Sequence, residues 1–250
     1  RDRVMNCRAK VLGLPTGSTP EGLYSEMVKG YKKGEIDFSD VHTFNLDEYI
    51  GLPPNDPQSY RHFMNKHLFD HVNIKKENVN FLDGLTSDIE HECARYEEAI
   101  VSVGGIKLQV VGIGRDGHIG FNEPGTSLTS RTHIITLAQS TIEDNARLFF
   151  NGKTEKVPKW ALSMGVGTVL DADEVLMIAF GANKAEAIHG MLEGPTTSMN
   201  PSSALQLHPN VTVIIDEAAA SKLKYREYYH MTAPGSETAM LKFLAAARKK

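Results

Sequence analysis

Short hydrophobic segments rich in β-branched residues recur along the chain, separated by longer segments in which hydrophobic positions follow helical spacing. This pattern predicts strands at residues 10–14, 41–46, 79–82, 106–113, 133–137, 175–180 and 211–215. Strands that alternate with helices in this way are typical of a mainly parallel sheet covered by helices. The sequence therefore predicts an α/β fold with an open, doubly wound sheet of the Rossmann-like kind.

Polar residues placed before hydrophobic repeats mark the starts of helices. Asp88 is expected to cap a helix that includes residues 89–100, where hydrophobic positions share one face. Ser140 and Glu143 have the spacing of a capping box, which predicts a helix over residues 141–150.

Composition is that of an ordinary globular chain, because 41% of the 250 residues are hydrophobic and 23% are charged. No repeat or Pro/Gly-rich linker divides it, so one domain over residues 1–250 is predicted. The longest apolar run, residues 175–180, is far shorter than the roughly 20 residues of a membrane-spanning helix. The N-terminus also lacks a signal-peptide core, so we expect a cytoplasmic protein without a membrane partner.

Charge and cysteine content exclude further classes. A formal net charge of −4, with the dense basic run confined to residues 248–250, argues against a nucleic-acid partner. Cys7 and Cys93 lie outside any CxxC pair, so we expect neither a disulfide framework nor a zinc site. Both are expected to be buried or inert.

Four polar clusters directly follow four of the predicted strands, at residues 15–20, 47–49, 114–123 and 181–184. Open α/β sheets bind ligands beyond the carboxyl ends of their strands. The four clusters are therefore predicted to meet in one crevice.

The first cluster contains Thr16, Gly17, Ser18 and Thr19, followed by Pro20, which is favoured at the first position of a helix. Such a loop directs backbone N–H groups and hydroxyls at an anion, and the helix dipole adds positive potential. The alternative is a tight turn with Thr19 as N-cap, and the loop by itself leaves both interpretations open. A Walker loop is excluded because its Gly-Lys-Ser/Thr is missing.

In the second cluster, Asp47 directly follows a predicted strand. A carboxylate in a partly desolvated crevice has a raised pKa, which suits a general base. The alternative, a solvated turn residue, stays open for this position taken alone. Glu48 is expected to be structural, because neighbours on an extended segment point in opposite directions.

The third cluster satisfies G-x-G-x-x-G after a strand, which is the fingerprint of a dinucleotide site. We reject that interpretation because Gly117, Gly120 and Pro124 would break the helix that has to begin there. In addition, the strand at residues 133–137 does not end in the acidic residue that would hold a ribose.

Asp116, His118 and Glu123 lie close together in this third cluster. A histidine flanked by carboxylates is held in one tautomer with a raised pKa, which predicts proton transfer near neutral pH, although a lone loop histidine is often a surface residue. Two cations complete the set: Arg147 and Lys184 are each solvated by default, and together they supply the planar fork and the point charge that a phosphate needs. The residues thus predict an enzyme that uses acid–base chemistry on a phosphorylated substrate.

The sequence resembles the glucosamine-6-phosphate deaminase family at these positions. The matching stretches are residues 12–17, 43–49, 116–119, 121–124, 130–132, 157–159, 165–168 and 205–209. The resemblance extends from about residue 11 to residue 229.

This resemblance implies an amino-sugar isomerase and hydrolase that converts glucosamine 6-phosphate into fructose 6-phosphate and ammonia by ring opening, aldose–ketose isomerisation and deamination. It implies that Asp47 carries the proton, and that His118 assists ring opening with support from Asp116 and Glu123. It places the phosphate on residues 17–19, Arg147 and Lys184. A mobile helical lid over about residues 138–158 is also implied, with no metal or organic cofactor and with a possible homo-oligomer.

Three departures from the family pattern stand out. Family members normally have another strand and helix before residues 10–14, and the tail at about residues 230–250 has no counterpart in the family and has the pattern of an amphipathic helix. Allosteric members also bind N-acetylglucosamine 6-phosphate through an arginine and a lysine, where this chain has His133 and Ile135. The resemblance therefore predicts hyperbolic kinetics without activation by that effector.

Two rival functions remain at this stage. A 6-phosphogluconolactonase has a related fold but hydrolyses a lactone, and it needs no base to move a carbon-bound proton. A non-catalytic sugar-phosphate sensor would keep the phosphate loop but would have little use for Asp47, His118 and Glu123 together.

Overall fold

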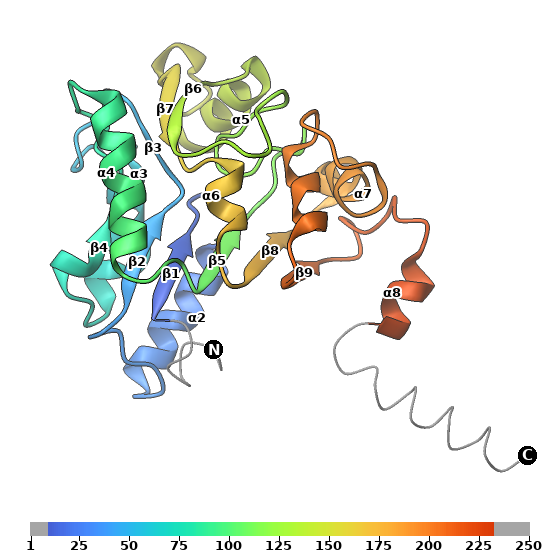
Figure 1. Cartoon of the computed structure of the whole chain (residues 1–250), viewed down its shortest axis with the longest axis horizontal. Helices are drawn as coiled ribbons and strands as arrows, with labels where there is room; N and C mark the ends of the chain where they lie inside the picture. The colour runs from blue at the N-terminus through green and yellow to red at the C-terminus, as the bar shows by residue number, and fades with distance from the viewer. Residues whose placement is uncertain (1–9, 233–250) are drawn as a thin grey trace, which may run out of the picture.

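The computed structural model describes residues 10–232 of the chain. Its main sheet contains six parallel strands in the order β4-β2-β1-β5-β8-β9 (Figure 1). The strands are β1 (Val11–Leu14), β2 (His42–Asn45), β4 (Val79–Asn80), β5 (Leu108–Val111), β8 (Val175–Ala179) and β9 (Val211–Ile215). An open, parallel α/β sheet was the predicted fold class, and it is confirmed.

Helices cover both faces of this sheet, which explains why its central strands are hydrophobic throughout. Alternate residues of β8 belong to different clusters: Met177 packs with α4, α6 and α7, whereas Ile178 packs with α2 and α3. The helices are α2 (Glu21–Lys32), α3 (Tyr60–His67), α4 (Ile89–Ser102), α5 (Gln139–Phe149), α6 (Val166–Leu170), α7 (Ala185–Glu193) and α8 (Arg226–Thr232). Short 3₁₀ turns are η1 (Phe69–His71), η2 (Lys76–Asn78), η3 (Thr154–Lys156), η4 (Ala182–Lys184) and η5 (Pro201–Leu207).

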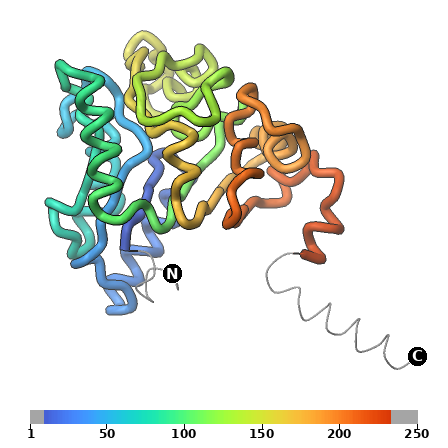
Figure 2. Tube along the Cα trace, viewed as in Figure 1, coloured from blue at the N-terminus to red at the C-terminus, as the bar shows by residue number. Residues whose placement is uncertain are grey.

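A second sheet, which the sequence pattern did not predict, is antiparallel and has the order β3-β7-β6. Its strands are β3 (Asp47–Tyr49), β7 (Trp160–Ser163) and β6 (His133–Thr136). The segment at residues 133–137 was predicted together with the parallel strands and belongs here instead. The cluster at residues 47–49 is itself a strand, because its backbone pairs with β7. This pairing forms only when the chain folds, so the sequence pattern did not predict it. This sheet and α5 lie together beside one end of the main sheet (Figure 2).

The helix starts differ in how well the sequence predicts them. Asp88 caps α4 as expected, since its carboxylate accepts the backbone N–H of His91. The capping box at Ser140 and Glu143 was wrong: Ala138 occupies the N-cap position of α5, and the hydroxyl of Ser140 donates to Asp116 instead. In place of a local cap, the carboxylate of Glu123 accepts the backbone N–H of Ala138.

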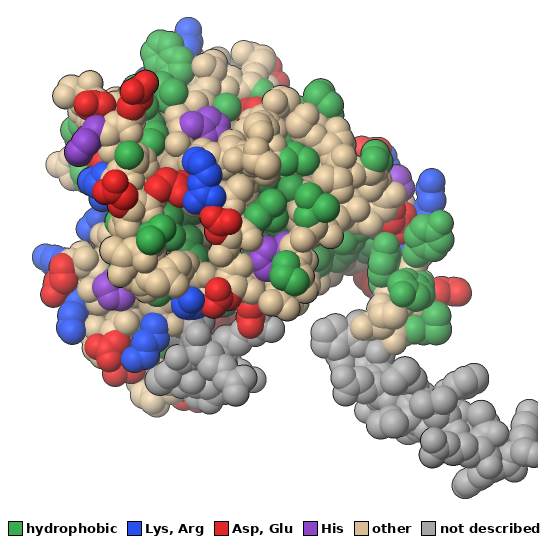
Figure 3. All heavy atoms as spheres, in the orientation of Figure 1, with side chains coloured by type: hydrophobic (Ala, Val, Ile, Leu, Met, Phe, Trp, Pro, Cys, Tyr) green, Lys and Arg blue, Asp and Glu red, His purple; other side chains and the backbone are tan. Residues whose placement is uncertain are grey.

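Towards the C-terminal end of the described part, α8 projects from the side of the molecule next to α7 and β9 (Figure 1). Its Tyr228 and Met231 are exposed, and hydrophobic side chains gather on this side of the face seen in Figure 3. The rest of the predicted tail, like the N-terminal segment with Cys7, lies outside the described residues. Cys93 is buried in α4, as expected. No helix within residues 10–232 is long and apolar enough to cross a membrane.

Candidate active site

A pocket of about 310 Å³ opens at the carboxyl ends of the central strands, which is where open α/β sheets bind their ligands. All four polar clusters contribute to its wall, so the predicted crevice is present. Its polar and aromatic lining comprises Thr16, Ser18, Thr19, Asp47, Tyr60, His118, Phe121, Thr141, Asp144, Asn145, Arg147, Phe180, Asn183 and Lys184.

Asp47 is the buried carboxylate of this pocket, with 6% of its surface exposed. It begins β3 and pairs with Ser163 of β7, so the second sheet fixes its backbone at the crevice. Burial, and then the nearby charge of Glu48, raise the pKa of Asp47 to about 8, although His118 opposes the shift. A carboxylate of this kind accepts a proton near neutral pH.

Gly120 allows the loop of residues 114–123 to approach this carboxylate closely. Its φ of 58° lies in the left-handed region, and a Cβ there would lie 3.0 Å from Oγ of Ser163 and 3.4 Å from Oδ2 of Asp47. The next residue, Phe121, donates its backbone N–H to Oγ of Ser163 at 3.1 Å. A side chain at position 120 would therefore push the loop away from Asp47.

His118 faces the pocket with Asp116 and Glu123 behind it. Its Nδ1 lies 2.8 Å from Oδ1 of Asp116 and 3.5 Å from Oε2 of Glu123, although neither contact has the alignment of an ideal hydrogen bond. Burial by itself lowers the pKa of His118, but the two carboxylates outweigh it and raise the pKa to about 9. In turn, His118 outweighs burial at Asp116 and holds the pKa of that carboxyl well below its usual range. The imidazole is therefore a cation at pH 7 that can donate a proton.

Glu123 and Asp116 also tie this loop to the start of α5. Oε1 of Glu123 accepts the backbone N–H of Ala138 at 3.1 Å and the hydroxyl of Thr141 at 2.6 Å. Oδ2 of Asp116 accepts the hydroxyl of Ser140 at 3.3 Å. The carboxylates that hold His118 thus also hold the helix that covers the pocket.

The ligand atoms of Asp116, His118 and Glu123 all lie within 4.8 Å of one another, which is compatible with a metal site. Their present contacts favour another use. The imidazole is placed as a proton carrier between two carboxylates, and one oxygen of Glu123 already accepts two hydrogen bonds from α5. We assign no metal to this cluster.

The loop from Thr16 to Thr19 lies at another part of the same wall. It connects β1 to α2, and the hydroxyl of Tyr24 on α2 donates to the carbonyl of Pro15 and anchors the loop. Pro20 directly precedes α2 in place of the predicted first helical position, and no side chain caps this helix. With Thr19 excluded as a side-chain cap, its hydroxyl is left for another partner.

The two predicted phosphate cations line the pocket but differ in their surroundings. Lys184 ends η4 beyond β8, and burial lowers the pKa of its ammonium group. Within residues 10–232, no carboxylate forms an ion pair with it. Arg147 on α5 is more exposed, with 63% of its side chain accessible. Its guanidinium nitrogen lies 3.4 Å from Oδ1 of Asp144. Lys184 is thus the better placed of the two to bind an anion strongly.

Sequence reasoning missed several residues of this site. Tyr60 arrives from α3, where its ring stacks on Phe121 at 5.8 Å between centroids and its hydroxyl contacts that of Tyr49 at 3.4 Å. Asn145 of α5 donates to the same Tyr49 hydroxyl at 2.7 Å. Neither position carries a motif, so only the tertiary structure brings them to the pocket.

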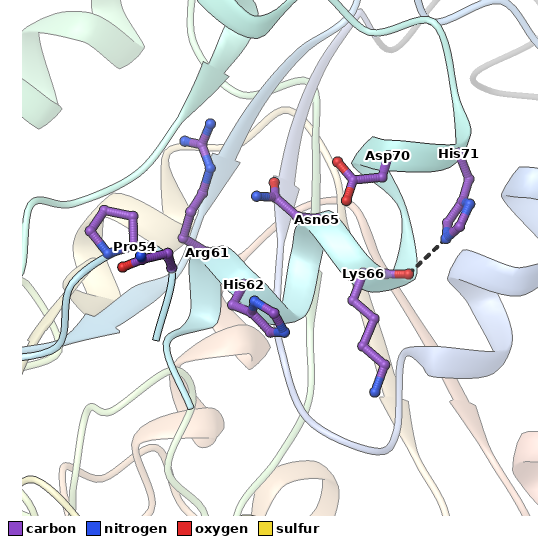
Figure 4. A pocket seen from close by; sticks show the side chains of 8 residues that line it. Pro54, Arg61, His62, Asn65, Lys66, Asp70 and His71 are labelled. Atoms are coloured by element: carbon purple, nitrogen blue, oxygen red, sulfur yellow. Dashed lines mark hydrogen bonds between the residues drawn. The ribbon is translucent and has the colours of Figure 1, made fainter. Parts of the chain in front are cut away.

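A larger hollow, of about 780 Å³, lies elsewhere, on the outer face of α3. The side chains that line it point away from one another: Arg61 and Lys66 extend in opposite directions, and the ring of His71 is hydrogen-bonded to the backbone carbonyl of Lys66 (Figure 4). Its carboxylate, Asp70, is exposed, and no buried carboxylate or imidazole is among the described residues that line this hollow, so its greater volume does not make it the candidate site.

Comparison with known proteins decides the family. Residues 5–214 match the family described as glucosamine-6-phosphate isomerases/6-phosphogluconolactonase. The chain belongs to this family. A protein of Thermoanaerobacter pseudethanolicus named glucosamine-6-phosphate deaminase is 53% identical over 211 residues, covering 84% of this chain and 83% of that protein. One of the same name from Hahella chejuensis is 52% identical over 221 residues, covering 88% and 84%.

Solved structures of the glucosamine-6-phosphate isomerase/6-phosphogluconolactonase family share the fold. A structure described as a monomeric glucosamine-6-phosphate deaminase is 45% identical with a TM-score of 0.84, covering 88% of this chain and 90% of that one. A 6-phosphogluconolactonase from Trypanosoma brucei is 18% identical with a TM-score of 0.68, covering 88% of each, which shows the fold alone. The relatives with about half of their residues identical are named deaminases, so the predicted class of hydrolase is replaced by isomerase and deaminase.

Proposed function

We propose that this protein converts glucosamine 6-phosphate and water into fructose 6-phosphate and ammonia. One observation carries the proposal: a buried carboxylate and a carboxylate-flanked imidazole line the same pocket as a hydroxyl-rich loop and Lys184. The first pair supplies acid and base, and the second supplies hydrogen bonds and charge for a phosphate. The relatives named deaminases support the same assignment.

His118 performs the first step, the opening of the sugar ring. With its pKa raised to about 9, it is protonated at pH 7 and donates a proton to the ring oxygen as the bond from that oxygen to C1 breaks. The neutral imidazole then takes the proton of the C1 hydroxyl, and C1 becomes an aldehyde. Asp116 and Glu123 hold the imidazole in place and stabilise its charge.

Asp47 performs the second step, the transfer of a proton from C2 to C1. Its carboxylate takes the proton from C2 while O1 of the aldehyde accepts a proton from His118, which gives an enol between C1 and C2 with the nitrogen on C2. The carboxylic acid of Asp47 then returns its proton to C1. Burial raises the pKa of Asp47 to about 8, which strengthens it as a base. A substrate amine bound as an ammonium would lower that pKa and favour the ionised form that accepts the proton.

Ammonia then leaves from C2. The ammonium at C2 loses one proton to solvent, so protonation of C1 converts the resulting amine into an iminium. Water then adds to C2 and loses a proton to solvent, which gives a carbinolamine. Loss of ammonia from that intermediate produces the C2 ketone of fructose 6-phosphate. The step consumes one water and needs no redox partner.

Binding of the phosphate falls to the loop from Thr16 to Thr19, to Lys184 and to Arg147. Backbone N–H groups at the start of α2 and a partly buried ammonium are suited to an anion. We propose that α5 and the segment after it, about residues 138–158, act as a lid, because residues of α5 form part of the pocket wall.

Association into a homo-oligomer stays a prediction, and a structural relative is described as monomeric. We propose a cytoplasmic location, because a phosphorylated sugar carries charge that does not cross a bilayer unaided.

The direct test is incubation of the purified chain with glucosamine 6-phosphate, without added metal or nucleotide. We expect ammonia and fructose 6-phosphate in equal amounts. Unphosphorylated glucosamine serves as the control for the phosphate and should react poorly. If 6-phosphogluconolactone is hydrolysed and glucosamine 6-phosphate is left intact, the lactonase alternative replaces this proposal. Binding of glucosamine 6-phosphate without turnover would favour the sensor.

A further inference from the structure

Glu48 is a buried carboxylate that the steps above do not use, although it follows Asp47 directly on β3. It has 3% of its surface exposed. Its Oε1 accepts the backbone N–H groups of Tyr49 and Tyr60, both at 2.9 Å, and its Oε2 accepts that of Arg61 at 2.9 Å. Three backbone donors offset the loss of hydration of this buried carboxylate and connect it to a second segment of the chain.

These hydrogen bonds join β3 to the first turn of α3. Tyr60 and Arg61 are the first two residues of the helix, where backbone N–H groups lack partners within the helix and the dipole favours an anion. Ser59 caps the same turn through His62, so Glu48 is a second, remote cap. The carboxylate thereby fixes α3 against the strand that carries Asp47.

The consequence for the pocket runs through Tyr60. This residue borders the pocket, its ring stacks on Phe121, and its hydroxyl contacts Tyr49. The side chain of the next residue, Arg61, turns the other way and lies over the ring of Phe81 at 5.0 Å, on the hollow shown in Figure 4. The first turn of α3 thus presents Tyr60 to the pocket and Arg61 to the outside, and Glu48 holds the turn in place.

We propose that Glu48 is a positioning residue of this site: it holds Tyr60 at the pocket through the first turn of α3 and places a second carboxylate beside Asp47. This inference rests on the proposed function, in which Asp47 is the base. Burial raises the pKa of Glu48 to about 7, so Glu48 is largely ionised at the pH where Asp47 titrates. Its charge then opposes the ionisation of Asp47.

Other groups also act on the two carboxylates. Arg61 on α3 attracts the charge of Glu48. The groups coupled electrostatically to Asp47 are Glu48 and Tyr49 on β3, His118 on its loop, Tyr24 on α2, Tyr60 on α3 and Tyr96 on α4. The tyrosines have raised pKa values and stay neutral near pH 8, so Glu48 and His118 are the charged neighbours that matter there.

Two variants separate the effect of the charge of Glu48 from the effect of its side-chain length. Glu48→Gln keeps the shape and removes the charge, whereas Glu48→Asp keeps the charge and shortens the side chain. We expect the acidic limb of the profile of kcat/KM against pH to move down by about 0.5–1 pH unit in Glu48→Gln and to stay in place in Glu48→Asp. Glu48→Asp should instead raise KM by about threefold to tenfold, because α3 and Tyr60 are held less well.

Glu193→Gln is the matched control, since Glu193 also accepts two backbone N–H groups, those of Lys224 and Tyr225, away from the pocket. This variant should lower Tm, but it should change neither KM nor the acidic limb of the profile of kcat/KM against pH. The proposal is overturned if the limb of Glu48→Gln coincides with that of the parent protein, or if Glu48→Asp leaves KM unchanged. Absence of ammonia production by the parent protein would instead contradict the proposed function.

Discussion

Asp47 and His118 divide the proposed chemistry because their environments shift their pKa values in ways that suit different roles. Asp47 is buried in the pocket wall, and the cost of desolvating its charge raises its pKa to about 8. His118 is held by two carboxylates, and its pKa rises to about 9. One group is therefore a strengthened base, and the other is an acid that keeps its proton at neutral pH.

Replacement of the base is the sharpest test at this scale. Asp47→Asn is expected to reduce kcat below about a thousandth of the parent value and to change KM by less than about tenfold, because the amide keeps the shape of the carboxylate. Because the pKa of Asp47 is raised from 3.8 to about 8, this residue lowers the stability of the fold progressively as the pH rises from about 4 to about 8. The variant should therefore unfold at an equal or higher temperature at pH 8 and above. Steady-state kinetics and thermal unfolding check both results, and near-parental turnover would remove Asp47 from the mechanism.

The pH dependence follows from the same two groups. Activity requires ionised Asp47 and protonated His118, so kcat/KM should rise with pH through about 8 and fall again above about 9. We expect a narrow bell-shaped profile in the parent protein. In His118→Gln the falling limb should disappear, and the loss of rate should be greater for the closed-ring sugar than for an open-chain analogue. Equal losses on both substrates would contradict a role in ring opening.

At the scale of elements, the loops after β1 and β8 and the helix α5 bring phosphate-binding groups to one pocket. Burial differs between the two cations, and this difference sets the size of the expected effects. Lys184→Ala should weaken binding of the phosphorylated substrate by about 1.5–3 kcal/mol, as for a charge-assisted contact. Arg147→Ala should cost about 0.2–1 kcal/mol, because solvent screens this more exposed side chain.

KM measurements on glucosamine 6-phosphate and on glucosamine check this prediction. The effect of Lys184→Ala should nearly vanish with unphosphorylated glucosamine. Lys222→Ala is the control, because Lys222 pairs with Glu186 on the surface outside the pocket. An equal loss on both substrates would mean that Lys184 binds a group other than the phosphate.

For the whole molecule, the prediction concerns regulation. The positions that resemble the effector cations of allosteric family members are occupied differently here: Nδ1 of His133 contacts the carbonyl of Arg131 at 2.7 Å, and Ile135 packs against the cluster that includes Tyr49 and Phe121. A ligand without differential affinity for two states shifts no equilibrium. We expect hyperbolic substrate dependence that N-acetylglucosamine 6-phosphate leaves unchanged. Initial rates with and without this compound decide the matter, and sigmoidal kinetics that become hyperbolic on its addition would contradict it.

The sequence by itself determined the features that depend on local periodicity and on short motifs. Buried parallel strands such as β8 are continuous hydrophobic runs, so their existence and approximate bounds follow from the pattern. The carboxyl ends of such strands have to meet at one edge of the sheet, which is why the clusters containing Asp47, His118 and Lys184 were correctly expected in one crevice. The likeness to a known family added the individual roles, which remain proposals.

Only the tertiary structure decided the features that depend on distant backbone partners. Residues 47–49 form a strand because β7 pairs with them from more than a hundred positions away, and α5 begins at a cap supplied by Glu123 and not by a neighbour. Tyr60 reaches the pocket because Glu48 holds the start of α3. Hydrogen bonds and burial between remote segments leave no periodic signal in the sequence, so these residues become part of the site only when the chain is folded.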